Sequence, residues 1–315
     1  MAKSQKVEVD PADFIEPLYI NGLNGRMLSV PAKKGQNREI LVIYGHHALL
    51  ERWWGLVQNF TDFGAVTMPD IPGFGGMDSF YKIGQKATLD NYADYMASFI
   101  KMRYKRKRVS IVGISFGFLV VTRMLQRYPE LVGRVDFLVS AAGFMRSDDF
   151  IFSRPRFLTY KYGCMVFRIR PLARVFRYVA LNAPVLRLAY AHTNNAKHKF
   201  AQADGKVQFN RMMDMEIRLW QQNDVRTYMQ TTIELLTVDN CKQRVDLPVW
   251  HVYTSQDHFF DHRIVEQHMR VVFNDFHGLP IKMKTHTVSV LADKKEAADL
   301  VPTALRRLLR KTATS

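Results

Sequence analysis

Residues 109–128 decide the fold, and they read Val-Ser-Ile-Val-Gly-Ile-Ser-Phe-Gly-Phe-Leu-Val-Val-Thr-Arg-Met-Leu-Gln-Arg-Tyr. The first four residues form a short apolar run typical of a buried strand, and residues 116–128 fit a helix stopped by Pro129. Ser115 lies between them, in Gly113-Ile114-Ser115-Phe116-Gly117. Glycines two positions either side leave room for a tight strand-to-helix turn that exposes the serine hydroxyl. The pattern therefore indicates a nucleophilic serine.

Strand and helix signals alternate on both sides of this turn. A Gly/Asn turn cluster at 21–25 separates two short strands and predicts a hairpin. The alternation that follows predicts a mostly parallel sheet with helices on both faces, that is, an α/β fold. The predicted strands are 39–44, 65–69, 109–112 and 135–140, and the predicted helices are 49–60, 89–104 and 116–128.

The pattern changes near Met145. From there to about Asn240 the apolar spacing is helical, without a convincing strand. Strand signals return at 248–253 and around 281–285, with helices at 263–273 and 294–309. We therefore expect an α/β core made of 1–145 and 245–315, with a helical cap, 146–244, inserted after the sixth strand.

The composition describes a basic protein of the ordinary globular kind. Among 315 residues, 45 are Lys or Arg and 29 are Asp or Glu, which gives a net charge of +16. No run of about 18 apolar residues predicts a membrane span, and no secretory signal is visible. The two cysteines, Cys164 and Cys241, have no metal-ligand spacing. These features favour a cytoplasmic location.

The excess positive charge is concentrated in one segment. Residues 150–203 contain ten Lys or Arg and no Asp or Glu, and arginines alternate with aromatic and aliphatic residues there. The apolar face could cover an acyl pocket, while the arginines could contact an anionic membrane or an acidic substrate. A solvated basic helix face is the alternative. Nucleic acid is not expected, because no recognised binding module accompanies the charge.

Over nearly its full length the chain resembles the α/β-hydrolase fold family. Beside the serine turn, the resemblance rests on Ile43-Tyr44-Gly45-His46, Pro69-Asp70-Ile71-Pro72-Gly73-Phe74-Gly75 and Tyr253-Thr254-Ser255-Gln256-Asp257. The family usually has His-Gly where this chain has Tyr44-Gly45. It usually has Gly before its catalytic histidine, where this chain has Thr285.

A serine hydroxyl needs a base, and the base needs a carboxylate that orients it. In this fold the order along the chain is serine, acid, histidine. The resemblance implies that His286, after the last predicted strand, is the base and that Asp257 is the acid. Asp261 is the alternative acid, and Asp148 or Asp149 a more remote one.

The resemblance also assigns an oxyanion hole to the backbone N–H groups of His46 and Phe116. His47, Trp53 and Trp54 are candidates for the pocket wall, although both tryptophans fit a core position equally well.

Two histidines four residues apart, His258 and His262, suggest a rival metal site. The spacing is similar to an inverted zinc motif, but the segment begins a helix instead of lying within one, and Asp261 stands where that motif has Glu. We therefore expect no metal and no cofactor.

The sequence predicts a serine hydrolase that cleaves an ester or related acyl bond of a small or lipophilic substrate. C–C or amide hydrolysis would use the same residues. Haloalkane and epoxide chemistry on this fold normally uses an Asp nucleophile. The competing hypothesis is a weakly active or inactive hydrolase-like protein that docks on an anionic membrane or partner through its basic cap, and the sequence leaves the oligomeric state open.

Overall fold

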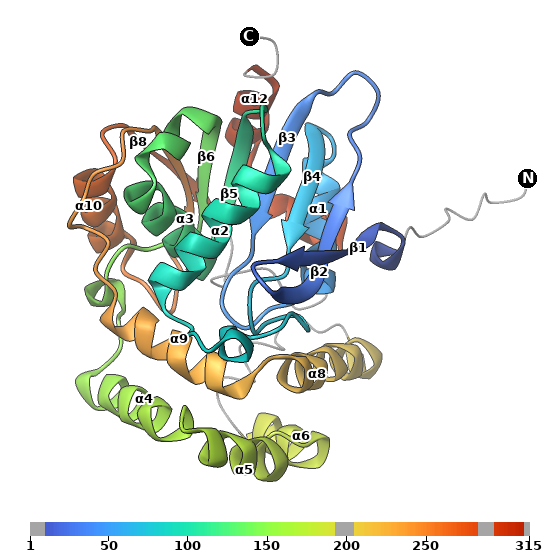
Figure 1. The fold of residues 1–315 in the computed structure, drawn as a ribbon, viewed down its shortest axis with the longest axis vertical. Helices are drawn as coiled ribbons and strands as arrows, with labels where there is room; N and C mark the ends of the chain where they lie inside the picture. The colour runs from blue at the N-terminus through green and yellow to red at the C-terminus, as the bar shows by residue number, and fades with distance from the viewer. Residues whose placement is uncertain (1–9, 193–204, 283–292, 312–315) are drawn as a thin grey trace, which may run out of the picture.

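The computed structural model describes residues 10–192, 205–282 and 293–311 and places eight strands in one sheet (Figure 1). The strand order is β1-β2-β4-β3-β5-β6-β7-β8. β1 and β2 form the predicted hairpin, β2 pairs antiparallel with β4, and every other pair is parallel. The strands are β1 (Ile15–Ile20), β2 (Leu23–Val30), β3 (Arg38–Ile43), β4 (Gly64–Pro69), β5 (Val109–Ile114), β6 (Val135–Ala141), β7 (Val249–Thr254) and β8 (Phe276–Ile281).

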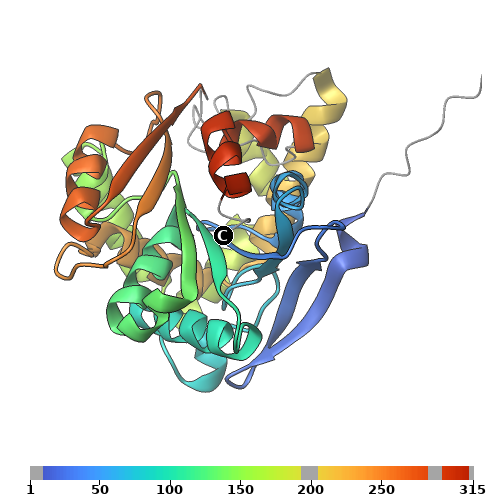
Figure 2. The same ribbon diagram turned by 90° about the horizontal axis from the view of Figure 1, so that it is seen from above.

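Helices cover both faces of the sheet, as the alternation predicts (Figures 1 and 2). α2 (Leu89–Arg103), α3 (Phe116–Arg127) and α10 (His262–Val272) lie on one face. α1 (Trp54–Phe60), α11 (Lys294–Ala297) and α12 (Thr303–Lys311) lie on the other. The central strands β3, β4, β5 and β6 are mostly apolar, since both faces of the sheet are buried there in one continuous core.

Short 3₁₀ turns punctuate the chain between these elements. η2 precedes α1, so the predicted helix 49–60 consists of two pieces. The 3₁₀ turns are η1 (Pro11–Phe14), η2 (Leu50–Trp53), η3 (Phe80–Ile83), η4 (Pro129–Arg134), η5 (Ser147–Asp149) and η6 (Ala298–Leu300).

Two sequence predictions near the C-terminus were wrong in their bounds. The last strand among the described residues is β8, which begins at Phe276, opposite Val249 of β7, and so starts earlier than the predicted Ile281; residues 283–285 of the predicted range lie outside the described residues. The helix predicted at 294–309 is broken into α11, η6 and α12. The break falls before Pro302, a residue that disfavours helical backbone at the position before it.

The described residues between β6 and β7 form helices and short turns, and this segment is called the insertion below. Its described helices are α4 (Arg154–Phe167), α5 (Arg170–Ala180), α6 (Ala183–His192), α8 (Gly205–Gln222) and α9 (Val225–Thr237). α8 and α9 lie across one end of the sheet, and α4, α5 and α6 lie beyond them (Figure 1). A second apolar cluster holds these helices together and includes Met212, Met213, Ile217 and Met229. Among the residues that the structure describes, no helix is both long and apolar enough to cross a bilayer.

Candidate active site

Four neighbouring parallel strands end at one edge of the sheet. Ile43 of β3, Gly113 of β5, Ser140 of β6 and His251 of β7 pair in one row across the sheet. The residues that follow each of them therefore emerge at the same edge, where an α/β sheet commonly binds its ligands. This register brings the Gly45–His47 segment, Ser115 and the loop that contains Asp257 to one edge of the sheet.

Ser115 occupies a strained turn at this edge. Its backbone has φ 49° and ψ −113°, outside the regions that L-residues ordinarily adopt. The Ser115 N–H donates to Ala141 O at 2.9 Å, and the Phe118 N–H donates to Ser115 O at 3.0 Å, so both sides of the turn are fixed. The hydroxyl does not cap α3, which begins at the next residue.

Three glycines permit this turn. A Cβ on Gly117 would lie 2.2 Å from Ile43 O, and a Cβ on Gly113 would lie 2.6 Å from the Phe118 Cα. Both approaches are to backbone atoms, which cannot rotate away. A Cβ on Gly45 would lie 3.4 Å from the Ser115 Cβ, so the backbone after β3 runs directly beside the serine. The two glycines of the sequence motif are therefore required by packing.

His46 follows Gly45 and is enclosed by aromatic rings. The ring of Tyr228 is 4.6 Å away, and those of Phe74 and Phe116 are 5.5 and 5.9 Å away. This burial lowers the pKa of His46 to about 4, so the ring is neutral near pH 7. Nε2 lies 2.7 Å from Thr231 Oγ1, and that hydroxyl donates to Thr227 O. The side chain of His46 is therefore anchored to α9.

His47 lies against the insertion, with a backbone φ of 56°. Its ring is 4.1 Å from that of Trp220 on α8 and 5.0 Å from that of Tyr228 on α9. The Asn223 amide lies 3.1 Å from His47 Nδ1 and accepts from the Gly75 N–H at 2.8 Å. The insertion thus contacts both loops that flank the end of β3 and the end of β4.

The two tryptophan candidates lie in other surroundings. Trp53 is only 2 % exposed and is part of the main apolar core. Trp54 stacks on Phe14 near the start of the described chain, with ring centroids 5.6 Å apart. The aromatic residues found beside His46 and His47 are instead Trp220 and Tyr228. No pattern in the sequence connected them to the two histidines, because they lie more than 170 residues farther along the chain.

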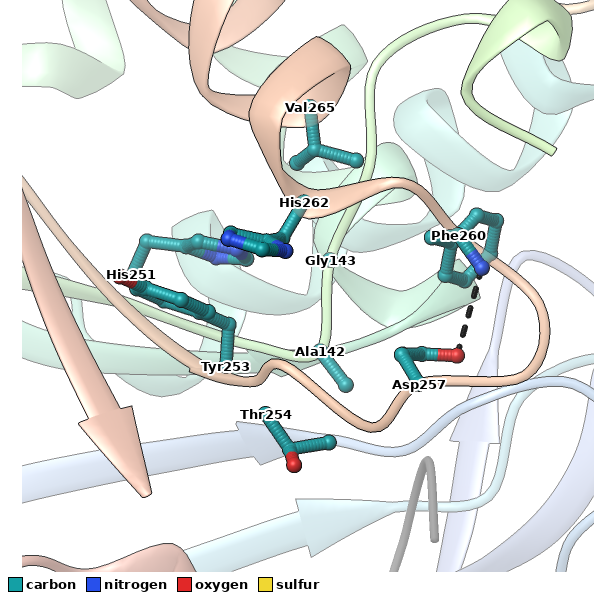
Figure 3. A pocket seen from close by; sticks show the side chains of 9 residues that line it. All are labelled: Ala142, Gly143, His251, Tyr253, Thr254, Asp257, Phe260, His262 and Val265. Carbon is teal, nitrogen blue, oxygen red and sulfur yellow. Dashed lines mark hydrogen bonds between the residues drawn. The ribbon is translucent and has the colours of Figure 1, made fainter. Parts of the chain in front are cut away.

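Asp257 lies in the loop after β7, beside a small pocket (Figure 3). Its Oδ1 accepts hydrogen bonds from the Phe259 N–H at 2.7 Å and the Phe260 N–H at 3.3 Å. Across the pocket from Asp257, the rings of His251, Tyr253 and His262 are stacked. The pocket is lined by Ala142, Gly143, His251, Tyr253, Thr254, Asp257, Phe260, His262 and Val265.

His251 is a buried histidine that sequence reasoning did not single out. Its Nδ1 lies 2.9 Å from the buried Ser140 hydroxyl. Burial lowers its pKa to about 3, while the nearby charge of Asp257 acts in the opposite direction and His262 acts with the burial. His251 is therefore a neutral ring in the sheet, held by the strand next to it.

The two alternative acids have other partners. Asp261 caps α10 and accepts from the Arg263 N–H at 2.9 Å. Asp149 is fully buried; its Oδ2 accepts from the Met145 and Arg146 N–H groups at 2.7 and 2.9 Å. Its Oδ1 lies 2.6 Å from Nδ1 of His268 on α10. Asp149 therefore pairs with a histidine other than the expected base.

Solved structures resemble this chain over nearly its whole length. A putative lipase from Acinetobacter baumannii AYE matches with a TM-score of 0.67 and 14 % identity, covering 99 % of each chain. The enol-lactonase from Burkholderia xenovorans LB400 matches with a TM-score of 0.63 and 12 % identity, covering 95 % of this chain and 100 % of its own. A bacterial membrane phospholipase A matches with a TM-score of 0.65 and 14 % identity, covering 94 % and 86 %. No family model matches the sequence, and a search of curated proteins found no significant match.

The chain has the α/β-hydrolase fold. The strand order, the parallel pairing and these likenesses agree on this point, and the resemblance seen in the sequence is confirmed at the level of the fold.

Where proteins of the α/β-hydrolase fold usually have His-Gly, Tyr44 of this chain makes a buried network. The Tyr44 hydroxyl donates to Asp70 Oδ1 at 2.8 Å and accepts from the Ile71 N–H at 2.9 Å. Burial raises the pKa of Asp70 to about 8, although Arg26, 3.0 Å from Oδ2, opposes the shift. Glu51 bridges Arg26, at 3.0 Å, and Arg218 of α8, at 2.9 Å. Tyr44 therefore links the end of β3 to the loop after β4. Glu51 connects this network to the insertion through Arg218.

The expected base, His286, lies outside the described residues, so its place at the site remains a prediction. β8 is parallel to β7, so the strand that precedes His286 ends at the same edge as β5 and β7. Of the rival metal residues, His262 stacks on Tyr253 at 5.0 Å. Within 10–192, 205–282 and 293–311 there is no group of three or more His, Cys, Asp or Glu side chains arranged to hold a metal ion.

Proposed function

We propose that this protein is a serine hydrolase that cleaves an ester or related acyl bond of a lipophilic substrate. The observation that carries the proposal is the turn at Ser115, where φ 49° is imposed by glycines packed against backbone atoms. Strain of this kind is kept where it aims a reactive group. The names of the similar structures, which include esterases, a lipase and an enol-lactonase, support the choice of an acyl bond.

In the proposed reaction, Ser115 Oγ attacks the substrate carbonyl carbon while His286 takes the hydroxyl proton. The C=O π electrons move to the oxygen, which becomes an oxyanion, and the backbone N–H groups of His46 and Phe116 stabilise it. The carbonyl then reforms, and the alcohol leaves with the proton from His286. Water, activated by the same histidine, hydrolyses the acyl-enzyme and restores Ser115. Asp257 orients His286 and stabilises its positive charge.

The surroundings of His46 support a lipophilic acyl group. Phe74, Phe116 and Tyr228 surround the ring, and Trp220 packs on His47. Because the pKa of His46 is lowered to about 4, this histidine adds no positive charge at neutral pH. Aromatic walls around a few placed polar groups are typical of sites for small apolar ligands.

A fluorophosphonate probe tests the proposed nucleophile. The wild-type protein should be labelled, and Ser115→Ala and His286→Ala should abolish the labelling. Ser255→Ala, in the loop that also contains Asp257, is the matched control and should label normally. A folded wild-type protein that no fluorophosphonate labels would contradict the proposal.

Hydrolysis of p-nitrophenyl esters of increasing chain length distinguishes Asp257 from Asp261 as the triad acid. Asp257→Asn should lower kcat by about 10³-fold or more, as the loss of an orienting carboxylate does. Asp261→Asn keeps a side-chain oxygen that can cap α10, so both the stability and kcat should be nearly unchanged. The reverse result would assign the triad acid to Asp261. Turnover of amides or β-diketones in preference to all esters would assign the same residues to another bond.

A further inference from the structure

The outermost helices of the insertion expose an unusual number of apolar side chains. Of the eighteen large apolar side chains that are exposed within the described residues, twelve fall between residues 151 and 188. Tyr178 is 73 % exposed, Val179 65 % and Leu188 62 %. Large contiguous apolar surfaces on a folded protein usually mark an interaction site. The outer face of α4, α5 and α6 is called the outer insertion face below.

α5 shows how this face is built. Ala173, Phe176 and Arg177 point inward: Ala173 is buried, Phe176 packs on Phe167, and Arg177 donates to the Asn223 carbonyl at 3.1 Å. Leu172, Val175 and Val179, at i, i+3 and i+7, are exposed on the opposite side. α5 therefore exposes apolar side chains on the side away from these inner contacts.

α4 repeats the arrangement. Leu158, Tyr162 and Val166, spaced four residues apart, are 38 %, 60 % and 47 % exposed. The other side of α4 packs on α9. In Figure 1, α4 and α5 form a row on the far side of α8 and α9 from the sheet. The exposed stripe of α4 therefore lies on the side of that helix away from α9.

Charge accompanies the apolar residues. Arg170 and Arg174 are exposed on α5, next to Val175, and Arg156 on α4 lies over the Phe152 ring at 4.5 Å. Residues 150–203 contain no Asp or Glu at all. A solvated helix face would ordinarily mix both signs of charge. Apolar side chains flanked by arginines, without acids, instead match an interface between hydrocarbon and anionic headgroups.

We propose that the outer insertion face docks on an anionic lipid bilayer, with α4 and α5 lying in the plane of the headgroups. Leu172, Val175, Tyr178 and Val179 would enter the acyl boundary, and Arg170 and Arg174 would contact lipid phosphates. A second copy of this chain is a poor occupant, because identical faces would bring arginines together. Nucleic acid is also a poor occupant, because it offers no apolar surface for these side chains. The inference concerns binding alone and does not depend on hydrolysis.

Vesicle co-sedimentation tests the docking. We would compare vesicles of phosphatidylcholine alone with vesicles that contain 30 % phosphatidylglycerol, using the wild-type protein and Ser115→Ala. Both proteins should bind the anionic vesicles and leave the neutral ones largely unbound, and 0.5 M salt should weaken the binding. Binding that is equal on both vesicles, or missing on the anionic ones, would overturn the proposal.

Paired variants locate the surface. Arg170→Gln with Arg174→Gln should lower the partition coefficient by about 30-fold, from the usual attraction of two basic side chains to an anionic surface. Val175→Asn with Val179→Asn should lower it at least tenfold at low salt, because apolar burial is lost. Lys105→Gln with Arg106→Gln removes the same charge after α2, at the N-terminal end of β5 and so at the opposite end of the sheet from the insertion, and should change it less than threefold.

Circular dichroism and thermal unfolding would confirm that each pair is folded, and if the valine pair is not, the arginine pair decides. If the Lys105 and Arg106 control lost as much vesicle binding as the Arg170 and Arg174 pair, the binding would depend on net charge alone. That result would refute binding through the outer insertion face. Concentration-dependent self-association of the wild type that the valine pair abolishes would identify a second copy as the occupant. RNA binding that competes with the vesicles and survives the valine pair would identify a polyanion. Either result would overturn the membrane proposal.

Discussion

Replacing His251 by Asn should flatten the acid dependence of stability. The ring is buried, and its pKa is lowered to about 3, whereas an unfolded histidine titrates near 6.5. The native state therefore binds fewer protons than the unfolded state between these two values, so stability falls as the pH is lowered from 6.5 towards 3. The loss is about 1.4 kcal/mol per pH unit, or about 2 kcal/mol between pH 7.5 and pH 5.

Urea unfolding at pH 7.5 and pH 5 measures this difference. His251→Asn keeps an amide atom near the Ser140 hydroxyl but loses ring contacts with Tyr253 and Phe276, so it should be less stable at both pH values. Its loss of stability on acidification should nevertheless be about 2 kcal/mol smaller than that of the wild type. Ser140→Ala is the control and should keep the wild-type dependence, because burial is the main cause of the shift. Equal acid dependence in wild type and His251→Asn would refute the reasoning.

Three further predictions concern the packing of the site. Gly117→Ala should lower the free energy of unfolding by about 3 kcal/mol and abolish probe labelling, because its Cβ would lie 2.2 Å from Ile43 O. The control Gly163→Ala, in α4, meets nothing within 4 Å and should raise the free energy of unfolding by about 0.5–1 kcal/mol. Unfolding midpoints compare the two variants. Asp149→Asn should lower the free energy of unfolding by about 3 kcal/mol, because it places an amide N–H₂ among the donors of Met145, Arg146 and His268. The control Asp148→Asn, at an exposed side chain, should change it by less than about 0.5 kcal/mol in the same assay. Arg26→Met should cost about 1 kcal/mol more at pH 9 than at pH 7, because the pKa of Asp70 is about 8 beside Arg26 and rises further without it, so that only the wild type ionises Asp70 at pH 9. An equal loss at both pH values would mean that Arg26 does not stabilise the Asp70 carboxylate.

A comparison of predicted and observed elements shows which patterns in the sequence were sufficient to predict a strand, a turn or a helix. The turn between β5 and α3 could be predicted because Gly113, Ser115 and Gly117 lie within five residues. The conformation of such a turn depends on neighbouring residues alone. The parallel strands β3 and β6 were readable because each is a mostly apolar run. β8 was misplaced because His277, Gly278 and Pro280 interrupt the apolar residues of Phe276–Ile281, and its pairing with β7 makes it a strand. An edge strand is stabilised by its neighbour more than by its own composition.

The sequence by itself determined the fold class, the serine turn and the helical character of the insertion, since all three depend on periodicity or on neighbouring residues. Tertiary structure decided what lies around the serine. Trp220, Tyr228 and Thr231 reach His46 and His47 only because α8 and α9 cross the end of the sheet, and Asp149 meets His268 across 119 residues of chain. Such contacts depend on the packing of distant segments, and no local pattern in the sequence records them.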